Sequence, residues 1–347
     1  MTRFRLDIAY DGTNFHGWAA QPGRRTVQAT LNQAIGELLA QLSAPPTHEC
    51  PTGPVGPRHD VWKIGAEGRF ELAPPQPPAS RNRPPEPGTP YQPDLRVEEA
   101  SVRSGPAGAP VACGSSSYQL TVAGRTDAGV HARAQVAHLD ADLGPDYAAA
   151  LAGRLPRLLP DDLIVRRVEV APAGFDARFS AIGRTYCYRL WDDISTPFPP
   201  ERHMVLPVRD HLDVTAMAQA ADSLLGLRDF VAFCRPRATA NGQVATTIRH
   251  LRRFDVTRVD DQTGTIECWL EADAFCHSMV RSLVGAVVAV GRGRRDMAWL
   301  ERVVASERRA NEVVVLPPQG LTLEGVQYPP DTQLGARAVE ARQVRQL

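Results

Sequence analysis

The stretch that decides how this chain is interpreted reads Ala123-Gly124-Arg125-Thr126-Asp127-Ala128-Gly129-Val130-His131. It follows a short apolar segment, residues 118–122, and places one carboxylate, Asp127, between two glycines. Glycine has no side chain to hold a ligand away, so such a loop lets a substrate backbone come close. Arg125 can bring a cation beside Asp127. The same pattern is also typical of a plain turn with a surface ion pair, so the loop alone leaves both interpretations open.

The composition is that of a globular protein. A length of 347 residues has room for about two domains. Hydrophobic residues make up 43% and charged residues 22%, which is enough to build a sizeable core. Residues 1–5 lead directly into an alternating strand pattern, so we expect no signal peptide. The most apolar run, residues 283–290, is far shorter than the ~20 residues of a membrane span, so we expect no membrane association.

The cysteines show neither a zinc spacing nor the density of a disulfide scaffold. We therefore expect reduced, mostly buried thiols and a cytoplasmic location. The six positions are Cys50, Cys113, Cys187, Cys234, Cys268 and Cys276.

The net charge of zero, from 39 basic and 39 acidic residues, does not by itself indicate a nucleic-acid-binding protein. All the basic residues except Lys63 are arginines, however, and several cluster, as at residues 249–253, 292–295 and 308–309. Arginine binds phosphate through a planar fork of donors, so local patches can bind RNA although the total is neutral. An arginine-rich, lysine-poor composition that reflects genomic base content is the equally plain alternative.

The first part of the chain reads as a strand, a loop and a helix. Residues 3–10 alternate between apolar and charged side chains, as in a half-buried strand. Thr26 is a suitable N-cap for a helix with apolar residues at helical spacing up to Leu42. Residues 43–117 then hold 16 of the 30 prolines, so we expect most of this insert to be disordered, with one possible hairpin at a sheet edge over residues 62–72.

The pattern after the Asp127 loop alternates strands and helices. Two helix limits are set by single residues: Pro156 is expected to stop one helix, and Gly226 to end another that Asp213 caps. Ser278 is expected to open a long apolar helix. Strands are expected over residues 135–139, 164–170, 185–190, 248–259, 265–271 and 321–326, and helices over 146–155, 213–225, 278–290 and 296–304.

Four motifs resemble, in order, those of the bacterial tRNA pseudouridine synthase A family. They are Tyr10-Asp11-Gly12 with Phe15 and Gly17-Trp18, the stretch 123–131, residues 177–181 with Arg184-Thr185-Tyr186-Cys187-Tyr188, and residues 275–285, Phe-Cys-His-Ser-Met-Val-Arg-Ser-Leu-Val-Gly. They extend over nearly the whole chain except the insert and the tail. The chain departs from the family in the insert itself, and in Ala19, where the family usually continues Gly-Trp with Gln.

The resemblance implies an α+β pseudouridine synthase fold of two similar lobes, with mixed or antiparallel sheets flanked by helices. We expect an N-terminal lobe from residues 1–42 plus 118–175, which carries the catalytic loop, and a C-terminal lobe from residues 176–328. Residues 43–117 form the insert and residues 329–347 a tail.

The resemblance implies that the protein converts uridine to pseudouridine in the anticodon stem-loop of tRNAs, at tRNA positions 38, 39 and 40. It also implies a cytoplasmic homodimer, as in the family whose motifs this chain carries. The reaction breaks the bond from ribose to uracil nitrogen, turns the base and rejoins it through carbon five. No atoms are lost and no redox change occurs, so we expect neither a metal nor an organic cofactor.

The resemblance assigns Asp127 as the catalytic carboxylate, acting at the base or at the ribose. Arg281 is the one charged residue on an apolar helix, and we expect it to pair with Asp127; the alternative is an arginine that snorkels to the surface. Tyr186 matches the tyrosine that stacks on the flipped uracil and can accept a proton, although a core tyrosine is the alternative.

Four further residues are candidates for substrate binding. The resemblance implies that Arg125 occupies the gap that the extruded base leaves. Phe275 and His131, and with them His277, are RNA contacts or pocket walls, or equally structural residues.

Two readings from other classes compete. The first is a catalytically silent tRNA-binding or chaperone protein of the same fold, against which the joint presence of Arg125, Asp127, Tyr186 and Arg281 argues. The second is a retaining glycosidase, which needs two carboxylates about 5 Å apart, whereas only one convincing candidate is present.

Overall fold

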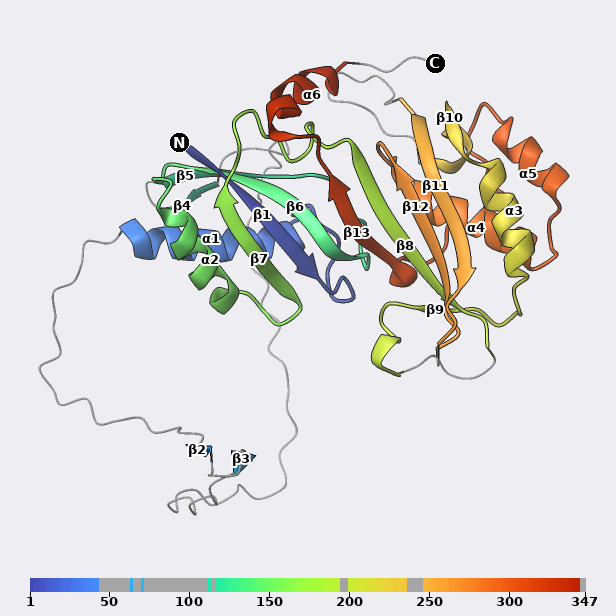
Figure 1. The fold of residues 1–347 in the computed structure, drawn as a ribbon, viewed down its shortest axis with the longest axis horizontal. Helices are drawn as coiled ribbons and strands as arrows, with labels where there is room; N and C mark the ends of the chain where they lie inside the picture. The colour runs from blue at the N-terminus through green and yellow to red at the C-terminus, as the bar shows by residue number, and fades with distance from the viewer. Residues whose placement is uncertain are drawn as a thin grey trace, which may run out of the picture. The chain divides into compact units, whose positions relative to one another are not determined.

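The fold is described from a computed structural model of the chain (Figure 1). The structure describes residues 1–43, 63–64, 70–71, 111–113, 116–193, 199–235, 246–261 and 263–343. The chain forms two compact units, one of residues 1–43 and 108–347 and one of residues 44–107. In the smaller unit, β2 (Lys63–Ile64) and β3 (Phe70–Glu71) pair antiparallel. The hairpin expected over residues 62–72 is therefore present, but as a two-stranded sheet of its own. The end of the insert is ordered, because β4 (Val111–Cys113) pairs with the start of β5 (Ser116–Val122) at Ser116. The disorder expected for the rest of the insert falls outside the described residues.

The larger unit is built on one eleven-stranded sheet, in which eight strands follow the order β10-β11-β12-β8-β13-β6-β1-β7. Beside this row, β4 pairs with β5, β5 with β6, and β9 with β8. The strands are β1 (Thr2–Tyr10), β4 (Val111–Cys113), β5 (Ser116–Val122), β6 (His131–Ala141), β7 (Leu163–Val170), β8 (Gly183–Trp191), β9 (Leu206–Pro207), β10 (Gly226–Asp229), β11 (Ile248–Arg258), β12 (Ile266–Ala272) and β13 (Leu321–Gln327). The predicted α+β class with a mixed sheet is confirmed.

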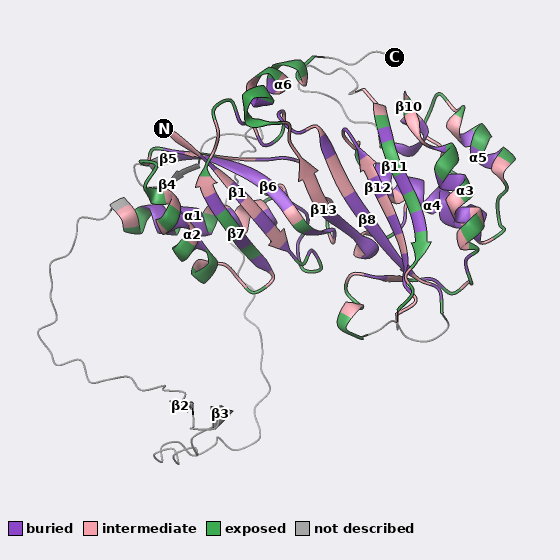
Figure 2. Cartoon of the chain, viewed as in Figure 1, coloured by how far each residue is buried: buried purple, intermediate pink, exposed green. Residues whose placement is uncertain are grey.

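The helices cover the two halves of this sheet separately (Figure 1). Helices α1 and α2 lie against the N-terminal half, and α3, α4 and α5 gather at the C-terminal half. Figure 2 shows buried residues along the central strands and exposed residues on the outer helices. The helices are α1 (Val27–Ser43), α2 (Tyr147–Leu158), α3 (Val214–Ser223), α4 (Met279–Gly291), α5 (Met297–Val304) and α6 (Leu334–Glu340), with short 3-10 helices at Pro199–Glu201, Val231–Phe233, Pro318–Gly320 and Asp331–Gln333.

The alternating pattern of β1 explains how the core of the N-terminal half is packed. Phe4, Leu6 and Ile8 are fully buried and join one hydrophobic cluster with the apolar face of α1. The helix begins where expected, because the Thr26 hydroxyl oxygen accepts a hydrogen bond from the Ala29 amide at 3.3 Å. Each fully buried aliphatic side chain contributes about 1.5–3 kcal/mol, so this face is what fixes α1 on the sheet.

Helix α4 is the buried core of the C-terminal half. Every residue of it is buried except Arg281 and Ala289, which are partly exposed. A Cβ atom on Gly285 would lie 1.9 Å from the Val314 carbonyl oxygen, so the glycine allows the segment before β13 to pack directly on the helix backbone. This contact places Arg281, one turn earlier, beside that segment.

Strand β13 joins the two halves. It pairs antiparallel with β8 and parallel with the start of β6, where Thr322 lies opposite His131 and Leu323 opposite Ala132. Strand β5 takes the place of β13 along the rest of that edge of β6, from Ala137 to Ala141. The loop between β5 and β6, residues 123–130, is therefore at the junction of the two halves.

Several expected limits differ in the structure. Helix α2 continues through Pro156 to Leu158, because a proline in the last turn removes only one backbone hydrogen bond. Helix α3 has Asp213 as its N-cap, as expected, but ends at Ser223, and Gly226, with φ of 107°, opens β10. Ser278 is the N-cap of α4, as expected, although its side chain makes no capping hydrogen bond.

The stretch expected to be a tail contains helix α6. Leu334 is buried against Phe175, Val136 and Ala177 on the opposite side of the sheet from the main cluster. Phe175 also contacts the ring of Tyr328 at 5.1 Å between centroids. At 7 residues, α6 is too short for its apolar spacing to be recognised in the sequence. No helix among the described residues has the length and apolar character needed to cross a membrane.

Candidate active site

The carboxylate loop, residues 123–130, is held from one side by the first loop, residues 11–21. The Trp18 amide donates to the Thr126 carbonyl oxygen at 3.1 Å, and the Gly129 amide donates to that of Phe15 at 3.1 Å. Gly17, with φ of 84°, lies so close that an added Cβ would be 2.9 Å from the Thr126 carbonyl oxygen. The two loops therefore meet backbone against backbone, and Gly17 of the first loop is required for this contact.

A buried polar network also supports the carboxylate loop. The hydroxyls of Tyr10 and Thr126 are 2.8 Å apart, and the Gln135 side-chain amide donates to the Gly124 carbonyl oxygen at 2.8 Å. Burial raises the pKa of Tyr10 to about 12, so its hydroxyl stays protonated and available for hydrogen bonding. The network fixes the residues on both sides of Arg125.

His131 closes the loop and is 1% exposed. Its Nδ1 accepts a hydrogen bond from the Gly12 amide at 3.0 Å and lies 3.1 Å from Asp11 Oδ1, and its Nε2 is 3.1 Å from the Gln319 carbonyl oxygen. Burial, the largest cause, lowers the pKa of His131, so Nε2 carries the proton and donates to Gln319. The ring thus connects the first loop to the segment before β13.

Asp127 projects from the carboxylate loop between the side chains of Arg281 and His277. Arg281 Nη1 is 3.1 Å from Oδ2, and His277 Nε2 is 3.2 Å from Oδ1. Burial opposes ionisation, but the hydrogen bonds and charges of His277 and Arg281 outweigh it and hold the pKa of Asp127 below its usual value. The carboxylate is ionised and about a quarter exposed, at 28%. The expected pairing of Arg281 with Asp127 is confirmed.

Arg281 reaches Asp127 in a fixed direction. It lies in the first turn of α4, and its Nε donates to the Leu316 carbonyl oxygen at 2.6 Å. The guanidinium is therefore bound to the segment before β13 on one edge and to the carboxylate on the other. It does not extend to the surface, because its side chain is only 17% exposed.

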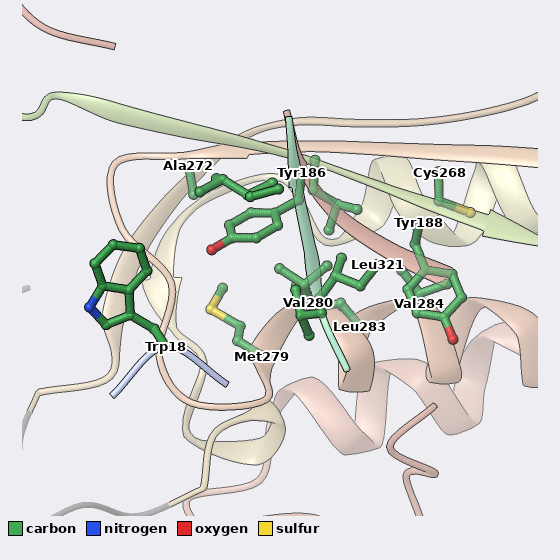
Figure 3. Close-up of a cluster of buried hydrophobic side chains, with 14 of the residues drawn as sticks. Trp18, Tyr186, Tyr188, Cys268, Ala272, Met279, Val280, Leu283, Val284 and Leu321 are labelled. Carbon is green, nitrogen blue, oxygen red and sulfur yellow. The ribbon is translucent and has the colours of Figure 1, made fainter. Parts of the chain in front are cut away.

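Tyr186 and Phe275 form an aromatic wall of the site. Tyr186 lies on β8 and Phe275 in the turn before α4, and their rings meet edge to face at 5.2 Å between centroids. Figure 3 shows the Tyr186 ring beside Met279 and Val280, with its hydroxyl pointing away from Tyr188. Burial raises the pKa of Tyr186, and its hydroxyl makes no hydrogen bond within the part of the chain that the structure describes.

Tyr188, two residues further along β8, is a core residue. It is fully buried, and its hydroxyl donates to the Pro317 carbonyl oxygen at 2.7 Å. Arg125 has an exposed side chain on the carboxylate loop. The structure thus brings together Asp127, Arg281 and the pair Tyr186 and Phe275 around one loop, whereas His131 lies buried behind it.

The sequence motifs contained Arg184 without assigning it a role. Its guanidinium donates to three carbonyl oxygens, of Asp273 at 2.7 Å and of Ala123 and Arg178 at 3.0 Å each. It thereby connects the start of the carboxylate loop to the end of β12, just before Phe275. Desolvation lowers its pKa. A cation on a strand that is otherwise largely buried was the available signal, but two of its carbonyl partners, Asp273 and Ala123, are far away in the sequence.

The prediction that all cysteines are reduced thiols is wrong for one pair. Cys234 and Cys276 form a disulfide with a Cα–Cα separation of 5.7 Å, whereas Cys187 and Cys268 are free and buried. The partners are 42 residues apart, so no short spacing marks them in the sequence. Among the described residues, no group of three or more potential ligands is placed to hold a metal ion.

Comparisons with known proteins indicate the family to which the chain belongs. A family model described as tRNA pseudouridine synthase matches residues 220–329. The tRNA pseudouridine synthase A of Cutibacterium acnes is 45% identical over 99% of this chain and 95% of its own length. The corresponding proteins of Frankia casuarinae and Streptomyces griseus are 40% and 38% identical, each over 99% of this chain and over 96% and 94% of their own lengths.

These full-length matches define an enzyme class, the pseudouridine synthases. Within that class, the chain belongs to the tRNA pseudouridine synthase A family. The resemblance inferred from the four motifs is therefore confirmed. A solved structure titled a Cbf5-Nop10-Gar1 complex matches 50% of this chain and 36% of its own at 12% identity, but a TM-score of 0.24 carries no argument about the fold.

Proposed function

We propose that this chain converts uridine to pseudouridine in the anticodon stem-loop of tRNAs, at tRNA positions 38, 39 and 40. The observation that carries the proposal is the ionised, partly exposed carboxylate of Asp127, which two side chains hold at 3.1 and 3.2 Å beside the aromatic wall of Tyr186 and Phe275. The family to which the chain belongs acts in this class of chemistry.

Asp127 is the catalytic carboxylate in this proposal. A nucleophilic or basic carboxylate must stay ionised when a substrate base closes over it and removes water, which raises the pKa of a carboxyl group. Arg281 opposes that effect, because its guanidinium is bound to Oδ2 and its direction is fixed by Leu316. The isomerisation retains every atom of the base and involves no change of oxidation state, so these side chains can supply the acid–base chemistry it needs.

Tyr186 and Phe275 receive the flipped uracil. Stacking on an aromatic ring contributes roughly 1–3 kcal/mol per base, which is comparable to the few kcal/mol that unstacking costs. The hydroxyl of Tyr186 takes the proton that leaves carbon five and passes its own proton to solvent in the same step, because burial keeps this hydroxyl protonated beforehand. Phe275 fixes the plane of the tyrosine ring by its edge-to-face contact.

Arg125 and His131 complete the assigned set. Arg125, exposed on the loop, fills the space that the extruded base leaves in the RNA stack. His131 contributes to binding through the loop that it closes, since its own ring is enclosed by Gly12 and Gln319. Recognition of tRNA by shape and phosphate explains how varied anticodon arms are accepted.

The organisation proposed for the protein is that of a cytoplasmic homodimer with two lobes. Residues 1–42 and 118–175 carry the loop, and residues 176–328 carry Tyr186 and Arg281. One subunit would hold the body of the tRNA while its partner performs the reaction. The two halves of the sheet that meet at β13 support the two-lobe division.

The test is incubation of the purified protein with an unmodified tRNA transcript, followed by mapping of pseudouridine at each anticodon-arm uridine. Wild-type protein is expected to form product at positions 38 to 40, and Asp127→Ala is expected to form none while still binding the tRNA. Binding without product in both proteins would favour the alternative of a silent tRNA-binding or chaperone protein.

A further inference from the structure

The two oxygens of the Asp127 carboxylate are held by different residues. Arg281 binds Oδ2 at 3.1 Å, and His277 binds Oδ1 at 3.2 Å. A carboxylate that is held at one oxygen only can still rotate about its last side-chain bond, whereas donors on both oxygens fix its plane. The proposed reaction uses Arg281 for this purpose and leaves His277 without a role.

The backbone around His277 is fixed from three directions. The His277 carbonyl oxygen accepts a hydrogen bond from the Arg235 amide at 3.1 Å, and the preceding residue, Cys276, is joined to Cys234 by the disulfide. The following residue, Ser278, has φ of 64°, and within the described ranges it is the only residue other than glycine with a positive φ. Such a conformation persists only where the surrounding structure enforces it, and it is concentrated at functional sites.

We infer that His277 is a positioning residue for Asp127, which orients the carboxylate through Oδ1 while Arg281 orients it through Oδ2. The inference rests on the proposed function of Asp127 and extends it to a residue in the turn before α4. His277 is 39% exposed at the mouth of the site, so no requirement of core packing accounts for its direction toward the carboxylate.

The groups that interact with Asp127 come from two packed elements. His277 and Arg281 belong to the turn and first helical turn of α4, and Tyr186 belongs to β8. The first loop contributes only backbone at this point, through Gly17. Loss of the His277 hydrogen bond and charge leaves burial less opposed, so the pKa of Asp127 rises and the acid limb of the reaction moves to higher pH.

A pair of substitutions that differ only in reach tests the inference. Gln at position 277 places its amide nitrogen where His277 has Nε2, whereas Asn places it where His277 has Nδ1, too short to reach Oδ1. We expect H277N to lower the single-turnover rate constant on bound tRNA transcript by about 10- to 100-fold and H277Q by less than about fivefold. The tRNA dissociation constant should change by less than about twofold in both, since the contact is within the protein.

A matched control is available elsewhere in the chain. His211 lies 3.2 Å from Asp192 with its side chain exposed, far from Asp127 along the chain and outside the proposed machinery. H211N should retain the wild-type rate. H277N with an unchanged rate, or H277Q as slow as H277N, would overturn the inference.

A second measurement is independent of turnover. Aspartate labelled with carbon-13 at the carboxyl carbon allows the Asp127 titration to be followed by NMR, with D127N to assign its signal. The pKa of Asp127 is expected to be higher in H277N than in wild type. Identical titration in the two proteins would overturn the inference, whereas absence of pseudouridine with wild-type enzyme would instead refute the proposed function.

Discussion

Substitution of Gly17 by alanine tests the packing of the two loops at the site. Gly17 has φ of 84°, and a Cβ atom there would lie 2.9 Å from the Thr126 carbonyl oxygen and 3.2 Å from the Asp127 carbonyl carbon. These neighbours are backbone atoms, which cannot rotate away as the end of a flexible side chain could. The added methyl must therefore move the loop that carries Asp127.

The cost has two parts. An alanine held at positive φ costs roughly 1–2 kcal/mol, and overpacking against fixed atoms costs typically about 1–3 kcal/mol. Substitution of Gly23 by alanine measures the conformational part alone, because Gly23 has φ of 67° but no atom within 4 Å of an added Cβ. Gly17→Ala should therefore lower the free energy of unfolding by about 2–5 kcal/mol, and Gly23→Ala only by the conformational part.

The assay is urea unfolding of both variants at neutral pH, together with single-turnover pseudouridine formation at a temperature where both remain folded. A displacement of about 1 Å at a catalytic group can cost 100-fold in rate, so a shift of a few tenths of an ångström in Asp127 should slow Gly17→Ala several-fold to tenfold. Gly23→Ala should retain the wild-type rate. Equal losses of stability in the two variants, with full activity in Gly17→Ala, would refute the described contact between the loops.

Three further predictions follow from buried groups. Burial lowers the pKa of His138 from 6.5 to about 4. Its stabilising contribution, on the order of 3 kcal/mol, is therefore complete above pH 6.5 and is lost as the pH falls toward 4. His138→Gln should show a smaller loss of unfolding free energy between pH 7.5 and 5 than wild type, and an unchanged loss would contradict this assignment. Reduction of the Cys234–Cys276 bridge, or Cys276→Ser, should lower the free energy of unfolding by up to about 4 kcal/mol, because the bridge joins residues 42 positions apart. Equal urea midpoints with and without dithiothreitol would argue against the bridge. Arg184→Met should lower both stability and turnover, because three carbonyl oxygens lose their donor, and a fully active variant would show that the loop does not depend on it.

The sequence predicted best where one residue type allowed few partners. A lone arginine on the apolar helix α4 predicted a counter-charge, and the family resemblance identified Asp127 as its partner. The strict alternation of β1 and the helical spacing of α1 likewise determined which faces are buried. In these cases the local pattern and the tertiary contact impose the same requirement.

Features that depend on distant contacts escaped prediction. Pro156 was expected to stop a helix, but its single lost hydrogen bond falls in the last turn of α2. The Cys234–Cys276 bridge and the contacts of Arg184 with Ala123 and Asp273 join segments that no spacing rule relates. The direction of His277 depends on the left-handed turn at Ser278, and serine gives no signal for such a conformation.

The place of β13 in the sheet has a consequence for how the protein is made. His131, at the end of the carboxylate loop, pairs with Thr322, a residue translated about 190 positions later. At roughly 5–20 residues per second, the ribosome adds the second strand about 10–40 seconds after the first. During that interval the nascent chain has Asp127 but lacks both the strand that closes the sheet beside it and the Leu316 carbonyl that orients Arg281. We therefore expect the enzyme to become active only near the completion of its synthesis, and a chain that ends before β13 to form no pseudouridine.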